Sequence, residues 1–138
     1  MEEGNSISSI YNCGFTRNTV WDNNGRGGGA IYMADTNSIS INGTSFRYNS
    51  AALAGGAIFG YYDNTVVIDD SSFEGNSLSE PSTGIVSTTG GAVYFGESHV
   101  SLTITSSAFM NNSAGSAGAI YTGMGSNGMV ITGCTFQN

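Results

Sequence analysis

The sequence predicts an all-β fold, a right-handed single-stranded parallel β-helix (a β-solenoid) of about four and a half coils with three short strands in each. Two short phrases recur along the chain, one half of the repeat has a nearly constant length, and apolar residues show no helical period of 3.6. We interpret residues 1–138 as a single β-helix domain. It would be a segment of a longer solenoid or a unit of an end-to-end assembly.

The first phrase ends in phenylalanine and recurs five times. An isoleucine lies five residues before each phenylalanine, a small residue lies two before it, and an asparagine follows three residues after the first four. The phenylalanines are Phe15, Phe46, Phe73, Phe109 and Phe136, and the isoleucines are Ile10, Ile41, Ile68, Ile104 and Ile131. The small residues are Cys13, Thr44, Ser71, Ser107 and Cys134, and the asparagines are Asn18, Asn49, Asn76 and Asn112.

The second phrase, Gly-Gly-Ala-Ile-Tyr or a close variant, alternates with the first and ends at Tyr32, Phe59, Tyr94 and Tyr121. From its alanine to the next phenylalanine the distance is 16, 16, 17 and 17 residues, whereas from each phenylalanine to the next alanine it is 15, 11, 19 and 10. Insertions are therefore confined to one turn of the coil. The shortest repeat, 27 residues, suits one coil of three strands: the Ala-Ile-Tyr phrase, a segment such as 38–41, and the segment ending at phenylalanine.

Stacking of coils explains the recurring residue types. Equivalent positions lie about 4.8 Å apart in neighbouring parallel strands, so like side chains form ladders. We expect the isoleucine and phenylalanine ladders to face inward. We expect the asparagines to adopt left-handed backbone at a sharp turn and to bond to one another through their amides. The glycines should lie where the chain turns tightly back into the sheet.

Composition excludes several classes of function. Ten acidic residues against three arginines, with no lysine, give a net charge of −7, and only 9% of residues are charged. A nucleic-acid partner is not expected, because phosphate neutralisation needs a basic stripe. Membrane insertion by this segment is not expected either, since no apolar stretch approaches about 18 residues.

The two phrases, Phe-x-x-Asn-[Ser/Thr] and Gly-Gly-Ala-[Ile/Val], resemble the repeats of the polymorphic outer-membrane protein family of chlamydial type. More loosely, they resemble the parallel β-helix of pectin-lyase-like architecture. The resemblance covers nearly the whole chain. It implies an extracellular or cell-surface location and a non-enzymatic structural or adhesive module that contacts carbohydrate or a host surface. The alternative that it leaves open is a polysaccharide-binding or polysaccharide-cleaving protein.

We assign no catalytic residue, metal ligand or cofactor. Asp69-Asp70 is the best carboxylate candidate, but it lacks a partner at general acid/base separation, so we interpret it as a turn-forming pair. The sparse acids Asp35, Asp63 and Glu97 fit solvated turns better than a Ca²⁺ site. His99, the only histidine, fits a polar surface position.

The binding candidates are aromatic: Trp21, Tyr32, Phe59, Tyr94 and Tyr121. The last four form a ladder that faces outward if the preceding residue of each strand faces inward. Such a strip could bind sugar rings or another fibre, or its rings could simply stabilise each other by stacking. In the reverse phase the rings would belong to the core. Trp21 lies in one of two insertions that leave the same turn, two coils apart, where it could bind a partner or cover the core.

Both ends of the predicted helix expose an apolar cross-section, with Ile10 and Phe15 at one end and Ile131 and Phe136 at the other. We therefore expect neighbouring β-helix coils, or copies of the chain packed end to end, as partners. Cys13 and Cys134 occupy the same ladder position in the first and last coils and are expected to act mainly as small core residues.

Overall fold

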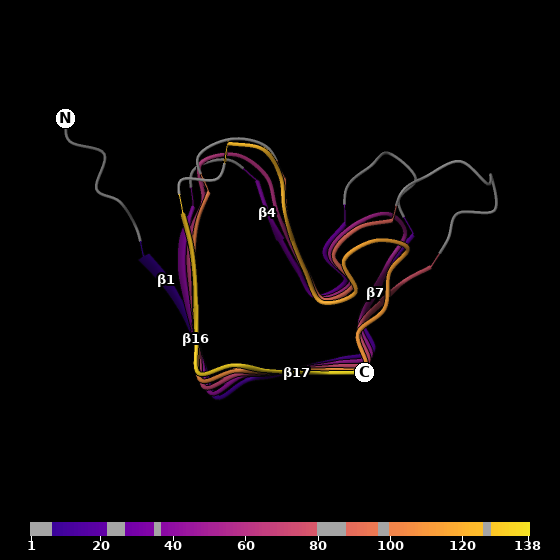
Figure 1. Ribbon diagram of the computed structural model, residues 1–138, viewed down its shortest axis with the longest axis horizontal. Coiled ribbons are helices and arrows are strands. Elements are labelled where there is room, and N and C mark those ends of the chain that lie inside the picture. Colours follow the sequence, from indigo (N-terminus) through magenta and orange to yellow (C-terminus); the bar gives the residue numbers. More distant parts are fainter. Residues whose placement is uncertain (1–6, 22–26, 35–36, 80–87, 97–99, 126–127) are drawn as a thin grey trace.

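A computed structural model describes residues 7–21, 27–34, 37–79, 88–96, 100–125 and 128–138. In this part of the chain every named strand pairs in parallel with the strand of the next coil, and no helix is present. The coils lie almost over one another when viewed along the stacking direction (Figure 1). The prediction of an all-β parallel solenoid is confirmed, with about four turns.

Two sheets of five strands form two walls of the coil. Sheet A contains β1 (Ile7–Tyr11), β5 (Ser38–Asn42), β9 (Thr65–Asp69), β13 (Ser101–Thr105) and β16 (Gly128–Thr132). Sheet B contains β2 (Gly14–Thr16), β6 (Ser45–Arg47), β10 (Ser72–Glu74), β14 (Ala108–Met110) and β17 (Thr135–Gln137).

Two smaller sheets complete the coil. Sheet D, the third wall, contains β4 (Ile31–Met33), β8 (Ile58–Gly60), β12 (Val93–Phe95) and β15 (Ile120–Thr122). Sheet C contains β3 (Thr19–Val20), β7 (Ser50–Ala51) and β11 (Ser77–Leu78). The sequence predicts three strands per coil and misses sheet C. Its strands have two residues each, which is too short to show an apolar alternation.

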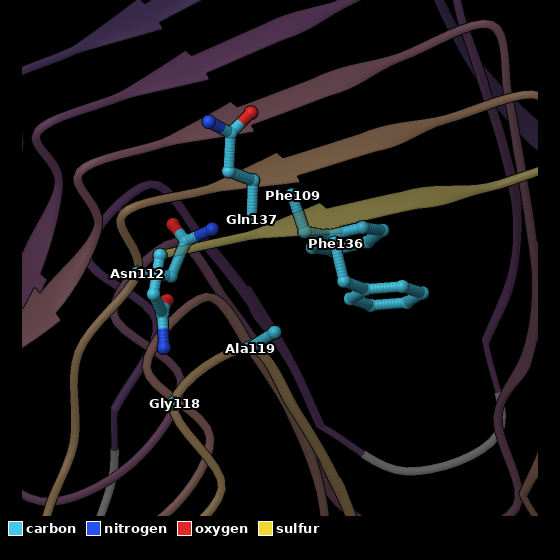
Figure 2. Close-up of a pocket in the computed structure, with 7 residues that line it drawn as sticks. Phe109, Asn112, Gly118, Ala119, Phe136 and Gln137 are labelled. Carbon is cyan, nitrogen blue, oxygen red and sulfur yellow. The ribbon is translucent and has the colours of Figure 1, made fainter.

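The core consists of the ladders between sheets A, B and D. The phenylalanines of sheet B stand opposite one another in register, and their rings stack with centroids 4.7–5.0 Å apart and planes within 9° of parallel. Figure 2 shows the last two rings, Phe109 and Phe136, one over the other. Ile41, Ile68 and Ile104 of sheet A are fully buried against this stack.

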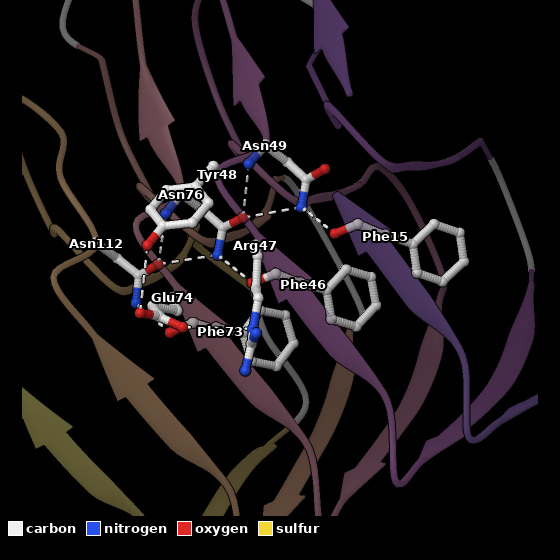
Figure 3. Close-up of polar contacts among 9 residues, drawn as sticks. All are labelled: Phe15, Phe46, Arg47, Tyr48, Asn49, Phe73, Glu74, Asn76 and Asn112. Carbon is white, nitrogen blue, oxygen red and sulfur yellow. Dashed lines mark hydrogen bonds and ion pairs between the residues drawn. The ribbon is translucent and has the colours of Figure 1, made fainter. Parts of the chain in front are cut away.

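The asparagine ladder closes the corner between sheets B and C (Figure 3). Nδ2 of Asn49 donates to the carbonyl oxygen of Phe15 in the previous coil and to Oδ1 of Asn76 in the next, each at 3.0 Å. The backbone N–H of Asn49 donates to the same Oδ1 at 3.0 Å, and Oδ1 of Asn49 accepts two hydrogen bonds from Asn18. Asn76 repeats the pattern with Phe46 and Asn112. The polar atoms of these buried amides are thus satisfied within the ladder.

The left-handed residue at this corner is the one before each asparagine, not the asparagine itself. It has φ between 51° and 62° in four successive coils: Arg17, Tyr48, Gly75 and Asn111. The expectation of left-handed asparagines is therefore wrong. The physical reason is that the turn is made one residue earlier, which aims each asparagine side chain inward to bond between coils.

The small-residue ladder closes the corner between sheets A and B with hydroxyl groups. Oγ of Ser71 donates to the carbonyl oxygen of Asp69 and accepts the N–H of Thr44 from the previous coil. Cys13 and Cys134 occupy this ladder, unpaired with one another, and each thiol contacts the carbonyl oxygen two residues before it.

The two glycines of the Gly-Gly-Ala phrase are required for different structural reasons. Gly90 has a φ of 69°, and the equivalent residue of the next coil is Ala117, with a φ of 51°. Gly91 has no positive φ requirement, but a Cβ there would lie 2.0 Å from the carbonyl oxygen of Gly118. The first glycine is needed for backbone conformation and the second for close approach of the coils.

Replacing Asn76 by alanine should lower the free energy of unfolding by about 3 kcal/mol or more. The change leaves the buried N–H of Asn49 without its acceptor, at about 1–3 kcal/mol. It also removes the hydrogen bond donated by Nδ2 of Asn49 and those accepted by the carbonyl oxygen of Phe46 and by Oδ1 of Asn112, at about 0.5–1.5 kcal/mol each. Urea denaturation followed by circular dichroism measures the loss. Asn111→Gly, at an exposed left-handed position, is the control and should change little; an equally small loss for Asn76→Ala would contradict the ladder.

Replacing Ala117 by glycine should raise the free energy of unfolding by about 0.5 kcal/mol. Relief of the left-handed alanine, worth about 1–2 kcal/mol, exceeds the entropy that glycine loses on folding. Ala108→Gly, within β14, should instead destabilise by about 0.5–1 kcal/mol. Thermal unfolding of both variants tests the opposite signs, and a loss in both would refute this account of the turn.

Candidate functional site: the outer aromatic strip of sheet D

The outer face of sheet D carries a continuous row of aromatic side chains. In β12, Val93 and Phe95 are buried in the core, whereas Tyr94 between them is only partly buried. The register places equivalent rings side by side on the same face. We call this row the aromatic strip: Tyr32, Phe59, Tyr94 and Tyr121.

The rings of the strip stack along the solenoid. Neighbouring centroids are 5.0–5.4 Å apart and the ring planes lie within 12° of parallel. Phe59, between two neighbours, is 1% exposed, whereas Tyr32 at the end of the stack is 43% exposed. Because ring faces in the middle of the stack lie against other rings, the strip offers mainly ring edges and tyrosine hydroxyls to a partner. A sugar ring cannot stack on a face of Phe59.

Two further tyrosines extend the strip sideways. Tyr61 stacks near Phe59, with centroids 5.9 Å apart, and Tyr62 meets Tyr61 edge to face at 4.3 Å. Sequence reasoning missed this pair, since the Tyr-Tyr dipeptide occurs in a single coil and so falls outside the repeat. The sequence does contain one indication of this contact. Tyr61 lies two residues after Phe59, and in an extended strand such residues share a face.

Trp21 is not part of this strip. It follows β3 of sheet C and is 73% exposed. The insertion that contains it continues through residues 22–26, and the other includes residues 80–87 after β11. Because β7 lies between β3 and β11 in sheet C, the insertions leave the same turn two coils apart, as their positions in the repeat predict. The inserted residues themselves lie outside the described part of the chain.

The acidic candidates occupy structural positions where they are described. The carboxylate of Asp69 accepts hydrogen bonds from Nδ2 of Asn42 at 3.0 Å and from the hydroxyl of Thr105, in the coils on either side. Asp70 has a φ of 44° and makes the sharp corner into sheet B. Both oxygens of Asp69 are thus engaged in linking coils, as suits a turn-forming pair.

The other acidic candidates and the histidine form no cluster of metal ligands among the described residues. Asp63 is exposed, with a φ of 50°. Asp35, Glu97 and His99 lie outside the described residues. Within the described ranges no three His, Cys, Asp or Glu side chains come together as metal ligands.

A pocket lies at the C-terminal end of the stack (Figure 2). The rings of Phe109 and Phe136 line one side, and Asn112, Gly118 and Ala119 line the other. The side chains of Met129, Ile131 and Phe136 on this last described coil are between 37% and 50% exposed. The pocket occupies the place that a following coil would cover.

Comparison with known proteins identifies one repeat. Residues 43–61 match the repeat of the Chlamydia polymorphic membrane protein family. The matched segment contains Phe46, Asn49 and the Gly-Gly-Ala phrase at 55–57, so the resemblance that the two phrases indicate is confirmed. No curated protein and no solved structure gives a significant match.

The matched repeat and the stacked parallel sheets together indicate a surface-associated β-helix protein. No helix in the described part of the chain is long and apolar enough to span a membrane.

Proposed function

We propose that this chain is a non-enzymatic structural and adhesive module of a secreted or cell-surface β-helix protein. The observation that carries the proposal is the aromatic strip, an outward row of rings held rigidly by stacking on one another. Side chains fixed in this way lose little conformational entropy on binding, which favours contact with a partner. Tyrosine edges and hydroxyls supply both apolar contact and hydrogen bonds, as at many protein interfaces.

The framework suits display rather than catalysis. Ladders of phenylalanine, isoleucine and asparagine make each coil a copy of the last, so the solenoid is a stiff support. The aromatic strip, which recurs in each coil, then provides the contact surface. The partner that we propose is carbohydrate or another component of a host cell surface.

Beads coated with the chain should adhere to cultured epithelial cells, and the double variant Tyr32→Ser/Tyr121→Ser should bind at least fivefold fewer beads. Both changes remove ring edges from the ends of the strip, where they are least needed for folding. Tyr11→Ser, which removes a tyrosine 58% exposed on sheet A, is the matched control and should adhere normally.

Failure of the unsubstituted chain to adhere, or equal loss in the control, would refute the role of the strip. Incubation with acidic and neutral glycans accompanies the assay. Product release there would overturn the non-enzymatic assignment in favour of a polysaccharide-cleaving protein.

We propose further that the face formed by the last described coil is covered by another β-helix coil, supplied by a copy of the chain or by neighbouring coils. Exposed apolar side chains and a pocket lie together on that face. Unpaired strand edges beside apolar surface favour addition of further strands.

Phe136→Ser should shift the chain toward monomers, because the change removes an apolar ring, 50% exposed, from the face that would be covered. Sedimentation velocity over a range of concentrations, with reductant present, measures the distribution. Val67→Ser removes an apolar side chain, 39% exposed, from β9 in a central coil and should have no effect. An unsubstituted chain that stays monomeric at high concentration would contradict self-association.

A further inference from the structure

The corner between sheets B and C gathers the positive charge of the described chain. Arg17 and Arg47 are the arginines of the described ranges, in a chain that has no lysine and a net charge of −7. They lie in adjacent coils: the N–H of Arg17 donates to the carbonyl oxygen of Arg47 at 3.0 Å. Tyr48 stands one rung above Arg17, about 4.8 Å away along the stack. We call Arg17, Arg47 and Tyr48 the basic corner.

Tyr48 is held in place although it is 51% exposed (Figure 3). Its hydroxyl donates to Oε1 of Glu74 at 3.4 Å, and Oε2 of Glu74 pairs with Nε of Arg47 at 3.4 Å. The ring edge lies against Gly75, where a Cβ would come within 2.6 Å of both Cδ1 and Cε1. One carboxylate therefore orients both the tyrosine and the arginine.

Arg17 presents its charge without such a partner: among the described residues no ion pair involves its guanidinium. Arg47 contacts Glu74 through Nε, so the planar guanidinium retains donors on its far edge. The corner thus offers one fully available guanidinium, one that is partly available, and a fixed aromatic ring.

The fold requires a left-handed residue at this corner but does not require a bulky one. Arg17 and Tyr48 have φ values of 56° and 54°, in the left-handed region that bulky residues rarely adopt. The same rung in the next two coils is occupied by Gly75 and Asn111, residues suited to that conformation. Strain retained where a relaxed residue would fit points to a use for the side chains.

We propose that the basic corner binds an anionic sugar, one that carries sulfate or carboxylate. The proposal rests on the surface role proposed above but assigns it a second site, on a different face from the aromatic strip. Guanidinium groups recognise sulfate and carboxylate through paired N–H donors, and an exposed tyrosine ring contacts the C–H groups of a sugar.

The surroundings favour a sugar over an acidic peptide. Both edges of β6 are already paired, with β2 and β10, so no strand edge is free for an extended peptide to join. The residues of the corner occupy a convex turn. The footprint that we propose for the corner is one or two sugar residues.

The experiment measures binding of the full chain by isothermal titration calorimetry to three probes: a heparin-derived oligosaccharide, an oligogalacturonate and poly-glutamate. Arg17→Asn and Tyr48→Gly should each weaken sugar binding at least tenfold without lowering the thermal midpoint, because both changes relieve left-handed strain. Tyr11→Ser is the control and should bind normally. Raising the salt concentration from 50 to 200 mM should weaken binding of the unsubstituted chain, as expected for ion pairing.

Binding of heparin alone identifies sulfate as the recognised group, and binding of oligogalacturonate identifies carboxylate. Binding of neither, unchanged binding by both corner variants, or equally tight binding of poly-glutamate would overturn the proposal. The cell-adhesion assay distinguishes the proposed adhesive function from the proposed sugar site. If the beads fail to adhere while the corner still binds an anionic sugar, the adhesive function fails and the sugar site stands.

Discussion

The coil-to-coil spacing of the parallel strands constrains everything else in this molecule. Equivalent side chains in neighbouring coils lie about 4.8 Å apart. A residue type can therefore recur along a ladder only if it makes favourable contacts with another residue of the same type. Phenylalanine and isoleucine meet this condition by packing, and asparagine meets it by donating to and accepting from its copies. Like charges do not meet it. The low content of charged residues follows directly, and where Glu74 meets Arg47 in the same ladder the charges are opposite.

The same constraint explains which parts of the fold are predictable from sequence. Residues that stack on copies of themselves leave a periodic pattern, and Phe46, Phe73 and Phe109 can be aligned from spacing alone. Sheet C leaves no such pattern, because Ser50 and Ala51 are small and their strand is two residues long. The left-handed turn residue is hidden for a related reason. Arg17 and Tyr48 are not typical of that conformation, and only the tertiary corner imposes it.

The candidate site is less predictable than the fold because it depends on contacts between coils. The outward phase of the aromatic strip follows from alternation once the core face is known. Burial of Phe59 does not, since it depends on rings from both neighbouring coils and on Tyr61. Likewise, the structural task of Asp69 rests on Asn42 and Thr105, which are 27 and 36 residues away in the chain. The residues of the basic corner occupy positions where the residue type changes from coil to coil. A search for repeated residues therefore does not detect them.

The asparagine ladder also gives the solenoid a direction. Each Nδ2 that joins two asparagines points from an earlier coil to a later one, in every step from Asn18 to Asn112. The amide dipoles therefore add along the stack, with oxygen acceptors facing the first coil and amide donors facing the last. Two such stacks whose first coils met would oppose acceptor to acceptor, and their last coils would oppose donor to donor. An array extended through the ends would consequently be heterologous, head to tail, and polar, with two chemically distinct tips.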